Sequence, residues 1–205
     1  MSHYFENDKN IKSNERLIYA NIKNTELKFF VDNGIFSKKG LDFGTRSLLE
    51  NINIDSTKKK ILDFGCGYGP IGIYLAKTTN FQIDMLDINQ RAIMLAQKNA
   101  DLNKVKVNIF ESNLYANVVD KYDYIITNPP IRVGKDVLYK ILFEAQKYLN
   151  RNGELWLVIN KNQGAKTVVK DLAKLYNVKI IDKCKGFYII CAVNNWQLAD
   201  FLIKL

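Results

Sequence analysis

A chain of 205 residues with 47% hydrophobic and 25% charged residues predicts one soluble globular domain, because no run is long enough to span a membrane and the N-terminus lacks a signal peptide's apolar core. The three cysteines form no CxxC pair and the single histidine is His3, so we expect reduced thiols, no metal and a cytoplasmic location. The 30 basic residues outnumber the 21 acidic ones, and this net charge of +9 favours nucleic acid over a membrane as partner, although a Lys-, Asn- and Ile-rich proteome gives the same excess.

Residues 1–55 are expected to form an extension that packs on the rest of the chain. Alternating apolar residues over 15–22 and 26–32 predict a β-hairpin. The glycine-punctuated stretch 33–45 predicts a loop, and a short helix with apolar residues on one face is expected over 46–52.

From residue 60 onward, compact apolar runs of strand length alternate with helical segments. The predicted strands are 59–64, 81–87, 105–110, 122–127 and 154–160. The predicted helices are 69–78, 89–100, 136–149 and 165–176. This alternation indicates crossover units and a parallel sheet that is buried on both faces. The last two strands, 178–183 and 185–193, are too close for a crossover and are expected to pair antiparallel.

The predicted fold is therefore α/β and Rossmann-like, with helices on both faces of a mostly parallel sheet. It forms one structural domain, in which residues 56–205 are the core and residues 1–55 the β extension. Ligands of such sheets bind beyond the carboxyl ends of the strands, so the candidate functional residues are sought there.

A glycine-rich loop follows the first core strand in the sequence "ILDFGCGYGP". Gly65 and Gly67 allow backbone angles that other residues avoid and let a ligand approach main-chain amides, while Gly69 opens the next helix. The spacing is G-x-G-x-G after Asp63, and it differs from the dinucleotide pattern G-x-G-x-x-G. A carboxylate at the mouth of the loop favours a ligand with an ammonium or sulfonium group over a pyrophosphate.

Two polar residues follow the next two strands. Asp87 lies about twenty residues beyond the glycines, where an acid binds both ribose hydroxyls. Asn113 is placed to hydrogen-bond an adenine edge, so together the residues describe a bound nucleoside. The alternative is that these residues have structural roles alone. The glycines would then only form a tight turn, Asp87 would only precede a helix capped by Asn89, and Asn113 would only be a turn residue.

These motifs resemble those of the class I S-adenosylmethionine-dependent methyltransferases, whose seven-stranded sheet ends in an antiparallel strand. The resemblance implies that Gly65, Cys66 and Gly67 lie against the methionyl part of S-adenosylmethionine, that Asp87 holds the ribose, and that Asn113 and Leu114 frame the adenine. The candidate cofactor-binding residues are Asp63, Gly65, Cys66, Gly67, Gly69, Asp87, Ile88, Asn113, Leu114 and Asn128.

The turn "TNPP" follows the fourth core strand. An exocyclic amine is a poor nucleophile because its lone pair is delocalised into the ring. The side-chain carbonyl of Asn128 and the main-chain carbonyl of Pro129 can each accept one N–H and localise that lone pair. Pro129 and Pro130 hold the turn rigid. We therefore interpret Asn128, Pro129 and Pro130 as the catalytic residues of a methyl transfer to a planar amino nitrogen.

The longer run "NPPIRVGK", together with "GIFSKKGLDFGTRSLL", "NKN" and "KGF", resembles the RsmC-type ribosomal RNA guanine-N2 methyltransferases in a short single-domain form. The resemblance implies an enzyme that methylates a guanine N2 in 16S ribosomal RNA of the small subunit, and we expect the protein to be a monomer. Many related enzymes have an aromatic residue after Asn-Pro-Pro, and here Ile131 takes that position. The candidate substrate-binding residues are Phe36, Ile131, Arg132, Lys135 and Lys161.

Other readings of the same motifs are open. One keeps S-adenosylmethionine but changes the acceptor to an adenine N6 in tRNA or DNA, or to a protein glutamine amide. Another is a basic nucleic-acid-binding module without catalysis, in which the nucleoside pocket is vestigial.

Overall fold

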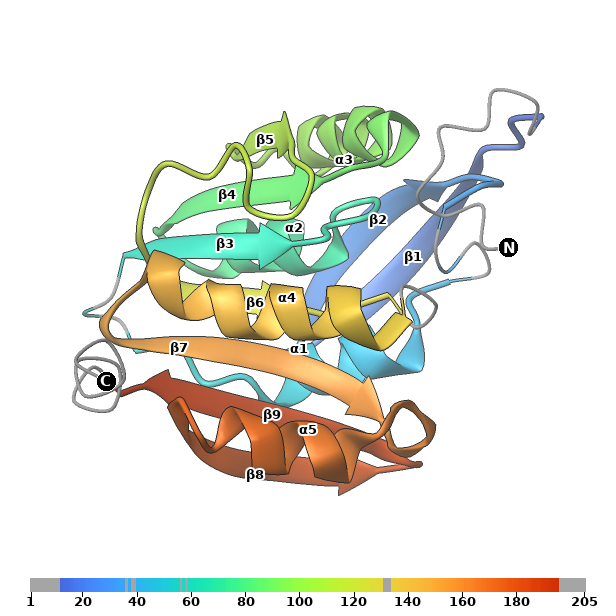
Figure 1. Ribbon diagram of the computed structural model, residues 1–205. Helices are drawn as coiled ribbons and strands as arrows, with labels where there is room; N and C mark the ends of the chain where they lie inside the picture. The colour runs from blue at the N-terminus through green and yellow to red at the C-terminus, as the bar shows by residue number, and fades with distance from the viewer. Residues whose placement is uncertain are drawn as a thin grey trace.

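A computed structural model of the chain describes residues 12–35, 37, 40–55, 57, 59–130 and 134–195 (Figure 1). Three candidate substrate-binding residues, Phe36, Ile131 and Arg132, lie outside this part of the chain.

The centre of the described chain is a seven-stranded sheet with the order β5-β4-β3-β6-β7-β9-β8. Its strands are β3 (Lys60–Phe64), β4 (Gln82–Asp87), β5 (Asn108–Glu111), β6 (Tyr122–Thr127), β7 (Leu149–Asn160), β8 (Tyr176–Cys184) and β9 (Phe187–Asn194). Strand β9 runs antiparallel to both of its neighbours, while the other pairs are parallel. The predicted fold class, including the antiparallel last hairpin, is confirmed.

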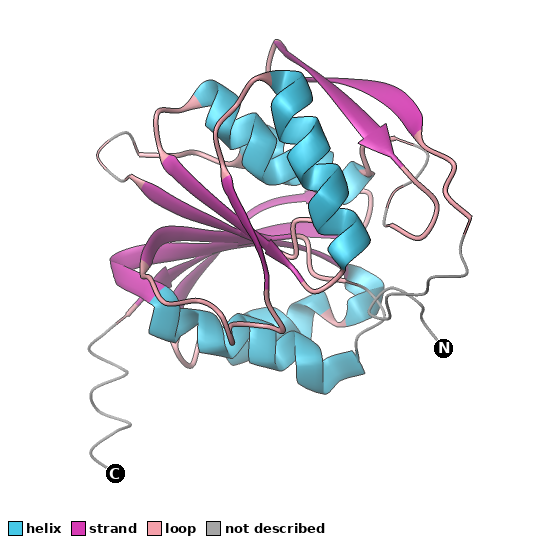
Figure 2. Ribbon diagram, turned by 90° about the horizontal axis from the view of Figure 1, so that it is seen from above, coloured by secondary structure: helices cyan, strands magenta, loops and turns pink. Residues whose placement is uncertain are grey.

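Helices cover both faces of the sheet (Figure 2). The helices α1 (Phe43–Asn51), α2 (Pro70–Thr78) and α3 (Gln90–Asn103) share one hydrophobic core, and α4 (Gly134–Tyr148) and α5 (Ala165–Leu172) share the other. Successive residues of a strand supply the two cores, as Ile61 and Leu62 do in β3. Because both faces are covered, the sequences of the central strands are almost continuous apolar runs.

A two-stranded hairpin of β1 (Arg16–Ile22) and β2 (Thr25–Val31) packs beside α3. Its turn residues Lys23 and Asn24 both have positive φ, as a two-residue hairpin turn requires. The amides of Asn99 and Asn103, one helical turn apart, bind the outer edge of β2. Asn99 exchanges two hydrogen bonds with the backbone of Phe30, at 2.7 and 3.0 Å, and Asn103 exchanges two with Lys28, at 3.1 and 2.7 Å.

Most element boundaries differ from the sequence prediction by a few residues, and the largest difference is at β7, which begins five residues early at Leu149. Three of the differences have a clear local cause. Strand β5 begins at Asn108 and not at residue 105, because the N–H of Val105 bonds to Ala100 and closes α3 after the left-handed Lys104. Helix α5 ends at Leu172, four residues early, because Tyr176 already pairs with β9. Helix α1 begins three residues earlier than expected, at Phe43, because the carboxylate of Asp42 caps it.

Candidate active site

The carboxyl ends of β3, β4, β5 and β6 lie at one edge of the sheet, which faces right in Figure 1. The loops that leave these ends contain the residues singled out from the sequence. Thr127 at the end of β6 donates its hydroxyl to the carbonyl of Phe64 at 2.9 Å, so the ends of the two central strands are fixed relative to each other.

The glycine loop has the backbone that the sequence predicts. Gly65, Gly67 and Gly69 have φ of +70°, +56° and +93°, values that favour glycine. A Cβ at Gly65 or Gly67 would meet no atom within 4 Å, so the space above the loop is open. A Cβ at Gly69 would lie 2.8 Å from Ile73, so this glycine serves the packing of α2.

Two side chains lie beneath the loop surface. Cys66 is buried, and burial raises the pKa of its thiol well above the ordinary value, so it is a packing residue. Asp63 is fully buried and lies below the loop rather than at its mouth. Its Oδ2 accepts the N–H of Gly72 at 2.8 Å, while its Oδ1 has no hydrogen-bond partner. Burial, aided by the charge of Asp87, raises the pKa of Asp63 to about 7.

Asp87 joins the end of β4 to the glycine loop. Its Oδ2 accepts the N–H of Gly67 and its Oδ1 accepts the N–H of Asn89, each at 2.9 Å. Burial raises the pKa of Asp87, and these backbone hydrogen bonds oppose that effect. Each carboxylate oxygen has a second lone pair, so Asp87 can accept further hydrogen bonds from a pair of hydroxyls. The neighbouring Ile88 is partly exposed beside it.

The loop after β5 lies next to Asp87. The N–H of Ser112 donates to the carbonyl of Asp87 at 2.9 Å, and the Ser112 hydroxyl donates to the carbonyl of Leu114 at 2.7 Å. Leu114 has φ of +53° and is partly buried, whereas the Asn113 side chain is exposed. The three residues that the sequence proposed for a nucleoside, Asp87, Asn113 and Leu114, are therefore on adjacent strand ends.

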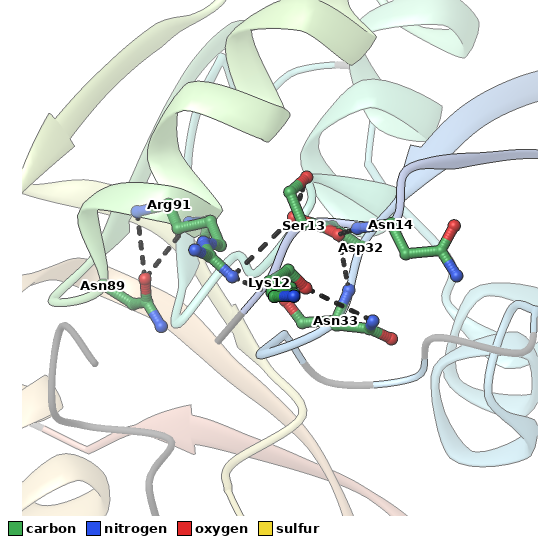
Figure 3. Close-up of polar contacts among 8 residues, drawn as sticks. Lys12, Ser13, Asn14, Asp32, Asn33, Asn89 and Arg91 are labelled. Atoms are coloured by element: carbon green, nitrogen blue, oxygen red, sulfur yellow. Dashed lines mark hydrogen bonds and ion pairs between the residues drawn. The ribbon is translucent and has the colours of Figure 1, made fainter. Parts of the chain in front are cut away.

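A polar network fixes the start of α3 at the border of this region (Figure 3). Asn89 caps the helix by accepting the N–H of Arg91, and the Arg91 guanidinium donates to the carbonyl of Asn33 and lies 3.8 Å from Asp32. Burial would raise the pKa of Asp32, but hydrogen bonds from Asn14, Ser13 and Asn33 and the charge of Arg91 outweigh it and lower the pKa. The network ties the chain before β1 to the end of β2 and to α3.

Asn128 lies directly after β6, partly exposed, and its amide orientation is defined by two neighbours. Its Nδ2 donates to Asp42 Oδ2 and to Thr45 Oγ1, each at 2.9 Å. Both N–H donors of the amide are thus used, and the Oδ1 carbonyl is the group left to accept a hydrogen bond. Sequence reasoning missed Asp42 and Thr45. The signal that could have revealed them is the acidic N-cap residue in the run Asp-Phe-Gly-Thr.

The turn continues through the buried Pro129 to Pro130, which borders an open hollow of about 590 Å³ between α4, the 3₁₀ helix η1 (Lys161–Gln163) and α5. Lys135 lines this hollow, and its Nζ lies 5.2 Å from the centroid of the Tyr139 ring. Lys161 is exposed next to the hollow, at the end of β7.

Two more lysines, Lys183 and Lys185, lie at the end of β8 and on the β8–β9 turn. The turn is bound to the end of β7 by a 2.7 Å hydrogen bond from the N–H of Lys161 to the carbonyl of Gly186. Lys185 Nζ lies 4.8 Å from the centroid of Phe43, and Lys183 Nζ lies 5.0 Å from that of Tyr188. We call Lys135, Lys161, Lys183 and Lys185 the lysine rim. Among the described residues, no group of His, Cys, Asp and Glu side chains is arranged to hold a metal ion, and no helix is apolar and long enough to cross a bilayer.

Comparisons with known proteins agree with this geometry. Residues 26–191 match the family described as the methyltransferase small domain. An uncharacterized protein of Bacillus subtilis, YbxB, is 40% identical over 93% of this chain and 97% of its own length. The ribosomal RNA small subunit methyltransferase C of Vibrio vulnificus is 37% identical over 68% of this chain, which spans only 42% of that enzyme.

A solved structure has a similar fold. It is the T. thermophilus 16S rRNA N2 methyltransferase RsmC in complex with AdoMet and guanosine, with a TM-score of 0.77 and 22% identity. The match covers 90% of this chain and 52% of that protein. At this identity the likeness shows the fold, and the chain spans about half the length of the RsmC proteins it matches.

Proposed function

The chain belongs to the methyltransferase small domain family, and we propose that it transfers a methyl group from S-adenosylmethionine to the exocyclic N2 of a guanine in 16S ribosomal RNA of the small subunit. The observation that carries the proposal is the Asn128 amide, whose Oδ1 is presented as an acceptor at the strand end next to the glycine loop. The relatives named for small-subunit RNA methylation support the choice of substrate.

The residues around the glycine loop fit S-adenosylmethionine. Gly65 and Gly67 leave open space above their backbone, and the carboxylate of Asp63 beneath them has an oxygen without a partner. Asp87 and Asn113 would hold the ribose and the adenine from the two adjacent strand ends. When bound, S-adenosylmethionine supplies an electrophilic methyl group on a sulfonium.

The protein's contribution at the acceptor is to orient and activate the amine. The Asn128 Oδ1 and the Pro129 carbonyl each accept one N–H of the exocyclic amino group, which turns its lone pair out of the ring. The buried Pro129 has a fixed φ, so the second acceptor is held without loss of backbone freedom. The amine loses one proton after transfer, and water can accept it.

The lysine rim supports RNA as the substrate. All four lysines are exposed: Lys135 lines the hollow beside Pro130, Lys161 follows the end of β7, and Lys183 and Lys185 lie at the end of β8 and on the β8–β9 turn. Lysines along such a border bind backbone phosphates, and the net charge of +9 increases the encounter rate with a polyanion. Arg132 is assigned the same role, and Phe36 the role of a surface for the base, by the sequence resemblance alone.

The proposal is tested by incubating the protein with labelled S-adenosylmethionine and either unmodified small subunits or free 16S RNA, and then identifying the methylated nucleoside by mass spectrometry. We expect N2-methylguanosine, and Asn128→Ala should reduce its formation about 10²-fold or more while donor binding is retained. Formation of N6-methyladenosine or of a methylated glutamine would contradict guanine as the acceptor and support one of the alternative acceptors. Donor binding without transfer to any RNA, DNA or protein would favour the non-catalytic module.

A further inference from the structure

We propose that Asp42 and Thr45 are positioning residues that lock the Asn128 amide with its carbonyl toward the substrate amine. The inference rests on the proposed function for its kinetic consequence, but the lock itself is a property of the unliganded chain. Asp42 and Thr45 lie 86 and 83 residues before Asn128 in the sequence, and their side chains converge on its Nδ2.

Asp42 is held by the helix that it caps. Its Oδ1 accepts the N–H of Gly44 at 2.8 Å and its Oδ2 accepts the N–H of Thr45 at 3.0 Å, so the carboxylate cannot rotate without loss of both bonds. The same Oδ2 also accepts from Asn128. Helix α1 in turn packs against β7 and β9, so Asp42 is anchored to the sheet.

The chemistry of the partners determines which end of the amide faces which way. An ionised carboxylate only accepts hydrogen bonds, so the amide nitrogen has to face Asp42 and the carbonyl has to face away. The Thr45 hydroxyl, almost fully buried, accepts the second amide proton. In the flipped orientation the amide would present N–H groups to the N–H groups of the substrate and would lose its function as acceptor.

Asp42→Asn separates the lock from the helix cap. Asparagine is as good an N-cap as aspartate, so α1 is retained, but one of the two acceptor oxygens becomes an NH₂ group. The Asn128 amide can then flip. We expect kcat for methyl transfer to fall about 10²-fold with an unchanged Kd for S-adenosylmethionine. Thr45→Val should lower kcat in the same direction, and Thr45→Ser, which keeps the hydroxyl, should restore it.

Asp123→Asn is the matched control. Asp123 accepts two backbone N–H groups, from Lys59 and Lys60, and one asparagine amide, from Asn150, which are the same kinds and number of donors that Asp42 receives. It lies at the start of β6, at the opposite edge of the sheet from Asn128. This change should leave kcat at the wild-type value.

A double-mutant cycle tests whether Asp42 acts through Asn128. In an Asn128→Ala background, Asp42→Asn should cause no further loss of kcat, because no amide remains to be oriented. Wild-type kcat in Asp42→Asn, or the same loss in both backgrounds, would contradict the lock.

A readout without substrate separates the lock from the proposed function. In ¹⁵N-labelled protein, the Asn128 side-chain amide protons should exchange more slowly with water than those of the exposed Asn113, and Asp42→Asn should remove this protection. Equal exchange at Asn128 and Asn113 would overturn the lock. Slow exchange at Asn128 together with no methylation of guanine would keep the lock and reject the proposed function.

Discussion

At the scale of single residues, the acids of the site differ in how the fold compensates for their burial. Asp87 receives two backbone hydrogen bonds, whereas the fully buried Asp63 receives one and has an oxygen without a partner. The pKa of Asp63 is accordingly raised from 3.8 to about 7. Asp63 is therefore protonated over a range of pH in which the unfolded chain would have ionised it.

This difference predicts a pH-dependent stability. Between about pH 4 and 7 the folded state holds a proton at Asp63 that the unfolded state has lost, so the free energy of unfolding should decrease as the pH rises through this window. The decrease from this residue is on the order of 4 kcal/mol at most. Urea denaturation of wild type and Asp63→Asn at several pH values measures it, because the variant lacks this contribution. Parallel pH profiles of the two proteins would contradict the raised pKa of Asp63.

Residue identity allowed much of the site to be predicted from the sequence. Gly65, Gly67, Asp87, Asn113 and Asn128 can be singled out because their types and spacing favour a nucleoside site, and the structure places all of them at neighbouring strand ends. The lock on Asn128 was not found, because a hydrogen bond across 86 residues leaves no local pattern. The sequence also predicted Asp63 at the mouth of the glycine loop, whereas its side chain is buried below the loop. A sequence shows that a carboxylate lies near the end of a strand, but not on which side of the backbone it lies.

At the scale of elements, the hairpin is held to α3 by asparagine amides that substitute for a neighbouring strand. Asn99 and Asn103 each satisfy both backbone groups of one β2 residue, and Asn99 also donates to the carbonyl of Tyr68 in the glycine loop at 2.9 Å. The same helix thus contacts the extension and the loop that is proposed to hold the methyl donor.

Removal of an amide should loosen the hairpin. Asn99→Ala leaves the N–H and carbonyl of Phe30 without partners, and we expect a loss of about 1–3 kcal/mol in the free energy of unfolding. Gln97→Ala, an exposed change on the same helix, should stay within about 0.5 kcal/mol of wild type. Denaturation curves give both values, and hydrogen exchange should accelerate at Phe30. An equal effect of the two changes would show that the amide does not hold the hairpin.

The types of the elements were predictable because apolar runs and helical periodicity are averaged over many residues. The ends of the elements depend on individual hydrogen bonds. Strand β5, helix α5 and helix α1 all have their predicted type and differ from the prediction only at their ends. In each case the cause is one contact, such as the carboxylate of Asp42 at the start of α1, that composition does not encode.

At the scale of the whole molecule, the sheet brings the glycine loop, the Asn-Pro-Pro turn and the lysine rim to one edge. The rim comes from the start of α4, the end of β7 and the β8–β9 turn, segments that the sequence separates. Only Lys135 and Lys161 of the rim were singled out from the sequence. Lys183 and Lys185 join them because β9 returns antiparallel beside β7 and places its turn next to Asn160.

Salt dependence tests the rim. Lys161→Ala combined with Lys185→Ala should weaken RNA binding at every sequence and reduce the slope of log K against log salt by about one to two. Lys106→Ala, an exposed change at the amino end of β5, is the control and should leave the slope unchanged. Filter binding or anisotropy over a salt series gives the slopes. The same slope for the double variant and wild type would remove the rim from the RNA interface.

A crystal structure of the protein with S-adenosylhomocysteine and guanosine monophosphate is the most direct test of the role of Asn128. We expect a guanine N2 within about 3 Å of both the Asn128 Oδ1 and the Pro129 carbonyl, with the Asn128 Nδ2 still bound to Asp42. A nucleobase bound away from Asn128, or an amide nitrogen of Asn128 turned toward the base, would contradict it.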